Sequence, residues 1–195
     1  YYEIATIKKI LNYPVNIKCG LFGRYLKSYP ISNLHNYNFK KLNFNALMNN
    51  YEKINISLVV NFIKNNKIQY SSISSPYKEV IMSYLDVITK ETAFIESVNN
   101  IVLKDNLFYG YNTDWKAMVR LLDDVNPKSV ILLGSGGTAQ GMAYALYQKN
   151  IDFTIYARNI DSRLKISNKY KTPNYNLKDN YKADLIINCL PKEIK

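Results

Sequence analysis

The 195-residue sequence predicts an α/β fold built from two domains. From about residue 20 onward, apolar positions at helical spacing alternate with short apolar runs typical of strands, which is the order found in layered α/β proteins. A glycine-rich turn near residue 134 lies between a strand pattern and a helix pattern, and a second strand pattern completes a β-α-β unit. We therefore expect a leading helix and linker over 1–19, an α/β domain over 20–113 and a second domain over 114–195.

The elements of the first half follow from changes in apolar period and from turn residues. Ile4, Ile7 and Ile10 lie at helical spacing and Pro14 follows them, so a short helix is expected before the first strand. The expected elements are a helix at 1–12, a strand at 18–22, a helix at 32–42, an extended segment from 43–48, a helix at 57–65, a strand at 68–75, a helix at 77–87, and strands at 98–103 and 107–111.

The second half begins with a helix pattern at 114–122, which we expect to link the two domains. After the Asn126-Pro127 break, residues 129–133 form a fully apolar strand pattern. The glycine-rich turn then opens a helix that runs to about residue 149, and a second strand is expected at 153–157. A further strand and turn are expected at 184–191.

Composition favours a small-molecule protein over a nucleic-acid or membrane protein. The formal charge is +11, but the lysines are scattered singly or in pairs and form no basic cluster, so a solvated basic surface that attracts anionic ligands is predicted. No segment reaches the roughly 18 apolar residues of a membrane span, and the N-terminus lacks the order of a signal peptide, which predicts a cytoplasmic protein. Cys19, Cys189 and the single His35 lie too far apart in sequence for a metal site.

The glycine-rich turn predicts a dinucleotide site. It matches G-x-G-x-x-A directly after a buried strand, where glycines allow a sharp turn and the positive end of a helix attracts a pyrophosphate. Small residues in such a turn can also serve packing alone, and this alternative stays open. The residues expected at the cofactor are Gly134, Ser135, Gly136, Gly137, Thr138 and Ala139.

The end of the second strand favours NADP as the cofactor. A carboxylate at this position would accept hydrogen bonds from the ribose hydroxyls of NAD, but here the strand ends at Ala157-Arg158. An arginine can pair with the 2′-phosphate of NADP and stack on the adenine. The alternative is a solvated arginine at the end of a strand.

Two further motifs place an ionisable side chain beside a turn: Ser75-Pro76-Tyr77-Lys78-Glu79 and Gly110-Tyr111-Asn112-Thr113-Asp114. Taken alone, Lys78 could be a solvated residue in the first turn of a helix, and Asp114 could simply cap the next helix.

The order of these two motifs, of the intervening segment 93–100 and of the glycine turn resembles shikimate dehydrogenase over about residues 20–191. The resemblance implies a Rossmann-like NADP-binding second domain and reduction of 3-dehydroshikimate to shikimate by NADPH, a step of aromatic amino acid biosynthesis. It also implies that Lys78 and Asp114 are the catalytic pair. Lys78 would exchange a proton with the reacting oxygen, and Asp114 would hold the lysine and a substrate hydroxyl.

The same resemblance implies further site residues. Asn99 matches an asparagine that bonds the substrate hydroxyls through an amide that can donate and accept. Ser72 and Ser74 stand where the family has Asn and Thr. The 184–191 segment resembles the family's Asn-Ala-Thr-Pro segment, which assigns Asn188 to the cofactor site.

The sequence also departs from the family. Where the family has a Ser-x-Ser pair for the substrate carboxylate, an ungapped alignment places Tyr29 and Ile31, although Ser28 and Ser32 lie one residue away. Isoleucine cannot donate a hydrogen bond. A quinate-like or analogous substrate, and a degenerate relative that binds a nucleotide or a partner domain without turnover, therefore stay open as alternatives.

The resemblance also bears on what flanks the sequence. It implies closing strands and a helix after Lys195, so the second domain is expected to be C-terminally incomplete. The leading helix suggests an upstream partner, such as the dehydroquinase domain that is fused to this family in some organisms.

Overall fold

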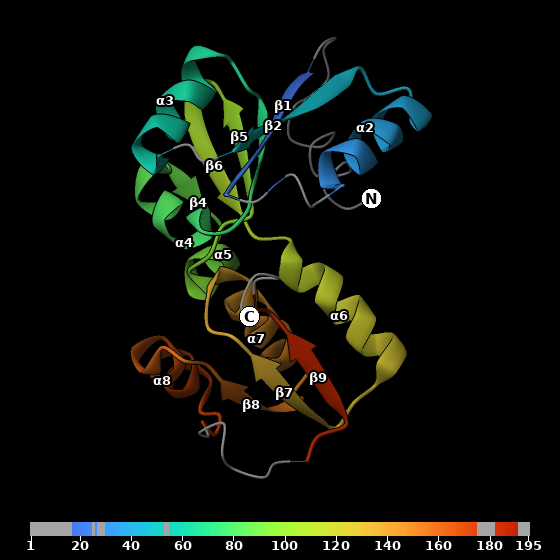
Figure 1. Ribbon diagram of the computed structural model, residues 1–195, viewed down its shortest axis with the longest axis vertical. Coiled ribbons are helices and arrows are strands. Elements are labelled where there is room, and N and C mark those ends of the chain that lie inside the picture. The colour runs from blue at the N-terminus through green and yellow to red at the C-terminus, as the bar shows by residue number, and fades with distance from the viewer. Residues whose placement is uncertain (1–16, 25, 27–29, 53–54, 175–181, 191–195) are drawn as a thin grey trace. The chain divides into compact units, whose positions relative to one another are not determined.

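The computed structural model describes residues 17–24, 26, 30–52, 55–174 and 182–190. The chain divides into two compact units, Tyr1–Thr113 and Asp114–Lys195 (Figure 1). The helix expected at 1–12 lies outside the described residues.

Unit 1 is built on a six-stranded mixed sheet in the order β2-β1-β3-β5-β6-β4 (Figure 1). β1 runs parallel to both β2 and β3, β5 is antiparallel to β3 and to β6, and β4 is parallel to β6. The strands are β1 (Ile17–Gly23), β2 (Ala46–Glu52), β3 (Tyr70–Ile73), β4 (Val87–Ile88), β5 (Asn100–Lys104) and β6 (Leu107–Tyr111).

Helices cover both faces of this sheet because β1 is apolar on both sides. Leu21 belongs to a buried cluster that includes Phe39 of α2, whereas the next residue, Phe22, belongs to a second cluster that includes Ile63 of α3. Consecutive strand residues point to opposite faces, so α2 and α3 pack on opposite sides. The helices of unit 1 are α2 (Ile31–Lys41), α3 (Ile56–Asn65), α4 (Tyr77–Val80), the 3₁₀ helix η2 (Ile81–Tyr84) and α5 (Lys90–Ile95).

The helix expected at 77–87 is shorter in the structure, because its end joins the sheet. Asp86 exchanges hydrogen bonds with Phe108, and Ile88 pairs with Gly110 of β6. A Cβ at Gly110 would lie 2.4 Å from Leu85 Cδ1 and 2.9 Å from Ile88 Cγ2. The missing side chain is therefore what lets this segment approach β6.

Unit 2 has a parallel three-stranded sheet in the order β8-β7-β9, which is the core of a Rossmann-like arrangement. Its strands are β7 (Ser129–Leu133), β8 (Asp152–Tyr156) and β9 (Leu185–Asn188), and its helices are α6 (Asp114–Val125), α7 (Gly137–Gln148) and α8 (Ile160–Tyr170). Among the described helices of both units, none combines the length and the apolar character that crossing a bilayer requires.

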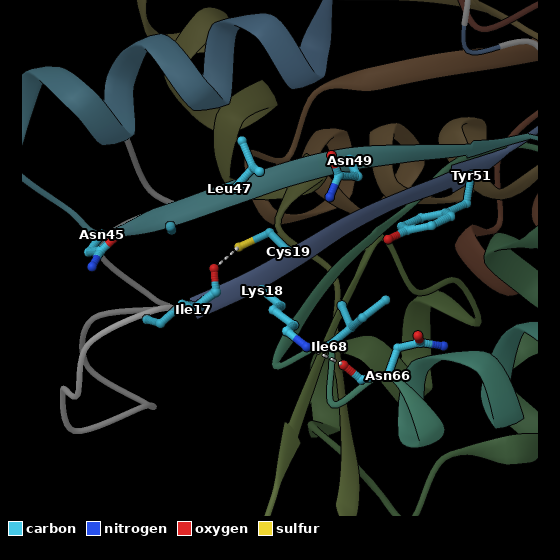
Figure 2. Close-up of a pocket in the computed structure, with 10 residues that line it drawn as sticks. Ile17, Lys18, Cys19, Asn45, Leu47, Asn49, Tyr51, Asn66 and Ile68 are labelled. Carbon is cyan, nitrogen blue, oxygen red and sulfur yellow. Dashed lines mark hydrogen bonds between the residues drawn. The ribbon is translucent and has the colours of Figure 1, made fainter.

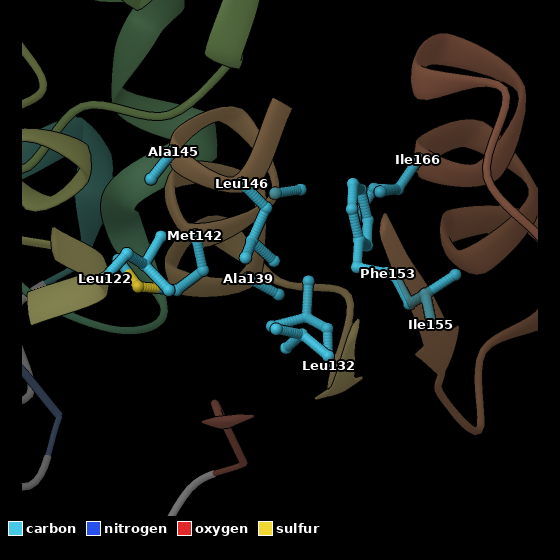
Figure 3. Close-up of a cluster of buried hydrophobic side chains, with 11 residues drawn as sticks. Leu122, Leu132, Ala139, Met142, Ala145, Leu146, Phe153, Ile155 and Ile166 are labelled. Carbon is cyan, nitrogen blue, oxygen red and sulfur yellow. The ribbon is translucent and has the colours of Figure 1, made fainter. Parts of the chain in front are cut away.

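The core of unit 2 forms between α7 and the sheet. Figure 3 shows Ala139 and Leu146 of α7 close to Leu132 of β7 and Phe153 of β8. Ala139, Leu132 and Leu146 are completely buried. The small Ala139 side chain at the start of α7 allows the helix to approach the strand closely.

Candidate active site

The predicted cofactor segments of unit 2 gather at one edge of its sheet. All three strands are parallel, and Leu133 at the end of β7 pairs with Tyr156 of β8 and with Asn188 of β9. The Gly134 N–H donates to the Tyr156 carbonyl at 2.8 Å. The glycine turn, Arg158 and Asn188 therefore lie at or just beyond the carboxyl ends of neighbouring strands, which is where ligands bind in open α/β sheets.

The glycine turn has a backbone conformation that favours glycine, and it leads directly into a helix. Gly134 has a φ of +109°, which L side chains rarely adopt, and a Cβ there would lie 3.4 Å from Cys189. Gly136 is exposed and precedes α7, whose twelve residues direct the positive end of the helix dipole toward the turn. Ala139 is buried in the core and contributes packing.

Arg158 is exposed and lies in the short connection between β8 and α8. The next residue, Asn159, is the N-cap of α8, and its side chain accepts a hydrogen bond from the Ser162 N–H at 2.8 Å. This cap fixes the point at which the chain leaves the sheet edge. Asn188 is also exposed, and its Oδ1 accepts from the Leu190 N–H at 3.0 Å.

In unit 1, backbone hydrogen bonds join the segments that carry the predicted catalytic and substrate residues. The Val98 N–H donates to the Lys78 carbonyl at 2.7 Å, and the Ile73 N–H donates to the Asn99 carbonyl at 2.7 Å. Asn99 N–H donates in turn to the Tyr111 carbonyl at 3.0 Å. The end of β3, the start of α4, the start of β5 and the end of β6 thus meet at one place.

A buried network of side chains lies at this place. The Tyr70 hydroxyl donates to Asn100 Oδ1, and Asn100 Nδ2 donates to Asn99 Oδ1 at 2.8 Å and to Thr113 Oγ1 at 2.7 Å. Asn99 Nδ2 donates to Thr113 Oγ1 at 3.0 Å, and the Thr113 N–H donates to Asn99 Oδ1 at 2.9 Å. The network ends at Thr113, the residue directly before α6 and its first residue, Asp114.

The network restricts what Asn99 can offer a ligand. Asn99 is 4% exposed, and its Oδ1 already accepts from Asn100 Nδ2 and from the Thr113 N–H. An amide oxygen has two lone pairs, so a hydrogen bond from Asn99 to a substrate has to come from Nδ2. The sequence had left both the donor and the acceptor side of this amide open.

The other predicted residues of unit 1 lie at or near its surface where they are described. Ser72, Ser74 and Lys78 are partly exposed, and Ser72 is directly opposite Asn100 in the sheet. Ser28 and Tyr29 lie outside the described residues.

The sequence reasoning missed Tyr70 and Asn100. Asparagine next to Asn99, and a tyrosine at the head of a hydroxyl-rich strand, were the available signals. Neither identifies the contact, because the two residues are thirty positions apart.

A groove of about 410 Å³ lies elsewhere in unit 1. Figure 2 shows that residues from the first half of β1, from β2 and from the turn before β3 line it. Lys18 Nζ donates to the Asn66 carbonyl at 3.3 Å. Ser72, Ser74, Lys78 and Asn99 are not among the residues that line it. The groove is therefore distinct from the site at the carboxyl end of β3.

A mixed-sheet unit with a buried polar network, followed by a Rossmann-like unit with a glycine turn, is the arrangement of two-domain α/β dehydrogenases. The sequence model described as the shikimate dehydrogenase substrate binding domain matches residues 23–101. The chain is 34% identical over 184 residues to a shikimate dehydrogenase (NADP(+)) of Clostridium botulinum, with 88% of this chain and 70% of that enzyme covered. The chain therefore belongs to the shikimate dehydrogenase family.

Two further comparisons agree with this assignment. The crystal structure of shikimate dehydrogenase 1 from Peptoclostridium difficile has a TM-score of 0.82 and 30% sequence identity, and the match covers 92% of this chain and 69% of that one. The shikimate biosynthesis protein AroDE of Chlamydia pneumoniae is 31% identical over 170 residues, which cover 82% of this chain and 35% of that protein. The predicted family, fold class and oxidoreductase class are confirmed, and NADP is the cofactor named for the Clostridium relative.

Proposed function

We propose that this chain carries the substrate site and the cofactor turn of an NADP-dependent shikimate dehydrogenase, which reduces 3-dehydroshikimate to shikimate. The observation that carries the proposal is the hydrogen-bonded group of segments that hold Lys78, Asn99 and Thr113. Asp114 follows Thr113 directly. Family membership supports the reaction class, and the grouping supports the assignment of the site.

The residues at the carboxyl edge of unit 2 fit a phosphorylated dinucleotide. Gly134 and Gly136 provide the tight turn at the start of α7, and the exposed guanidinium of Arg158 suits a 2′-phosphate. Asn188 would contact the cofactor at the end of β9. When bound, NADPH supplies the hydride, and the chain has to supply the site and the proton.

Lys78 and Asp114 are proposed as the catalytic pair. The Lys78 ammonium would donate a proton to the ketone oxygen as that oxygen gains negative charge, and the Asp114 carboxylate would hold the lysine and a substrate hydroxyl. Lys78 lies in the short helix α4, whose backbone is tied to the Asn99 segment by the Val98–Lys78 hydrogen bond. This bond supports a shared role for Lys78 and Asn99 at one site.

The substrate would be held by unit 1. Asn99 would donate through Nδ2, and the hydroxyls of Ser72 and Ser74 would bond the substrate ring. Ser28 and Tyr29 are retained as candidates for the carboxylate, because a hydroxyl at either position can donate.

The test follows nicotinamide absorbance with shikimate and NADP, then with quinate and with NAD, on the intact chain. We expect turnover with shikimate and NADP. Lys78→Ala should lower kcat by roughly a hundredfold or more, because general acid–base catalysis contributes about 10² to 10⁴. Lys90→Ala is the matched control, since Lys90 is an exposed lysine at the start of α5. An absence of turnover with every pair would refute the enzyme proposal and favour a binding-only relative, whereas turnover with quinate alone would reassign the substrate.

Cofactor choice is tested separately. Arg158→Ala should lower the preference for NADP over NAD by roughly tenfold to a hundredfold, the effect of losing a charged hydrogen bond. Lys128→Ala removes an equal charge at the amino edge of the same sheet and should leave the preference unchanged. An unchanged preference in Arg158→Ala would refute the 2′-phosphate assignment.

The proposal includes two statements about context. One is a dehydroquinase domain, fused to or associated with this chain. It is supported by the shikimate biosynthesis protein AroDE of Chlamydia pneumoniae, of which this chain covers 35%. The reading frame upstream of Tyr1 tests this directly. The other is a cytoplasmic location, which cell fractionation tests.

A further inference from the structure

We propose that Asn100 and Tyr70 are positioning residues: the Tyr70 hydroxyl fixes the amide of Asn100, and that amide fixes the side chain of Asn99 and the position of Thr113. The importance of this pair for substrate binding rests on the function proposed above. Neither residue is among the site residues predicted from the sequence.

The direction of the hydrogen bonds carries the inference. Tyr70 occupies Asn100 Oδ1 with a donated proton, so the other end of that amide, Nδ2, has to face Asn99 and Thr113. Asn100 uses both of its N–H groups there, one on Asn99 Oδ1 and one on Thr113 Oγ1. A rotated Asn100 amide would place its oxygen against Asn99 Oδ1, so the hydrogen bond between the two amides would be lost and two acceptors would face each other.

The orientation of Asn99 follows from that of Asn100. Asn99 Oδ1 accepts from Asn100 Nδ2 and from the Thr113 N–H, which directs Asn99 Nδ2 to the Thr113 hydroxyl. If Asn99 rotated, its N–H₂ group would meet two donors. The pair therefore fixes the orientation of the Asn99 amide, with Oδ1 held by Asn100 and Thr113.

Burial makes the loss of any of these hydrogen bonds costly. Tyr70, Asn99 and Asn100 are 2%, 4% and 3% exposed, so water cannot replace a lost partner easily. A buried polar group left without a partner is costly, and connected hydrogen bonds reinforce one another. Thr113, which the network holds, is 8% exposed and directly precedes Asp114 in the sequence.

Amide hydrogen exchange at Thr113 tests the positioning role without any need for activity. Tyr70→Phe removes one hydroxyl, which is linked to Asn99 and Thr113 through hydrogen bonds of Asn100. We expect the Thr113 N–H to exchange roughly threefold to tenfold faster in this variant. Tyr109→Phe is the control, because Tyr109 packs on the same sheet face and should leave Thr113 protection unchanged. Equal exchange in the two variants would overturn the proposal.

A second variant tests whether Tyr70 acts through Asn100. Asn100→Asp keeps an acceptor for Tyr70 but loses both donors, so Thr113 exchange should rise further than in Tyr70→Phe. Adding Tyr70→Phe to Asn100→Asp should then change little, because coupled residues are not additive. Additive effects would show that the tyrosine acts independently, which contradicts the relay.

Steady-state kinetics connect the pair to the reaction. Tyr70→Phe should raise the KM for shikimate by roughly tenfold and leave the KM for NADP unchanged, whereas a general loss of folded protein would lower kcat and kcat/KM equally and leave both KM values unchanged. Unchanged kinetics would overturn the link to substrate binding. A wild-type chain without turnover would refute the proposed function, and the exchange experiment would still decide the positioning role.

Discussion

Replacing Gly134 with alanine should destabilise unit 2 through the backbone. The φ of +109° lies in a region that L residues occupy at a cost of about 1–3 kcal/mol. The added Cβ would lie 3.4 Å from three atoms of Cys189, which is an ordinary contact distance, so a steric clash adds little. We therefore expect a loss of about 2 kcal/mol, nearly all of it from conformation.

Urea unfolding followed by tryptophan fluorescence measures this loss. Trp115 is the only tryptophan of the chain, and it packs on the unit 2 core with its ring edge-on to Tyr144. With a slope of about 2 kcal/mol per M of urea, Gly134→Ala should lower the midpoint by about 1 M. Ser135→Ala is the control, since that residue has no positive φ. Equal midpoints for the two variants would refute the conformational argument.

Three further predictions concern other parts of the chain. Burial raises the pKa of the Cys19 thiol to about 12, so Cys19 should resist a thiol reagent between about pH 6 and 9 until the protein is unfolded; rapid labelling of the native protein would contradict this. Hydrogen bonds from the two backbone N–H groups at the start of β7 lower the pKa of Asp184, so its contribution to stability is present at neutral pH and is lost as the pH falls through the lowered value; Asp184→Asn should unfold earlier than wild type at about pH 7 by thermal melting, and the gap should close in acid. Asn36 pairs with both the N–H and the carbonyl of Met48 on the edge strand β2, so Asn36→Ala should expose that edge and increase self-association in light scattering, whereas Asn33→Ala on the exposed side of α2 should not.

The elements with strong local patterns were predictable from the sequence. The strands at 107–111 and 129–133 lie where the apolar pattern predicted them, because turn residues bound each run. The helix α8, residues 160–170, was missed because only Ile166 and Ser167 of it are buried. With so few buried positions, the sequence shows no clear repeat of apolar residues at helical spacing. The two-residue strand β4 was missed because it exists only through its pairing with β6.

The candidate site also contains residues that the sequence could predict and contacts that it could not. The glycine turn and Arg158 carry their own local signals, so the sequence alone could locate them. The bond between Tyr70 and Asn100 depends on β3 lying beside β5, and no pattern within either strand reveals its neighbour. The orientation of the Asn99 amide likewise required three partners from separate segments.

The pairing of Tyr70 with Asn100 has a consequence for how β3 and β5 align. Side chains alternate with a period of two, so a register slip of two residues would keep every apolar side chain on its own face, and hydrophobic burial would discriminate weakly against it. The same slip would separate the tyrosine from the asparagine and leave two polar groups unmatched in the interior. We therefore expect the bond between Tyr70 and Asn100 to select one register between β3 and β5 during folding.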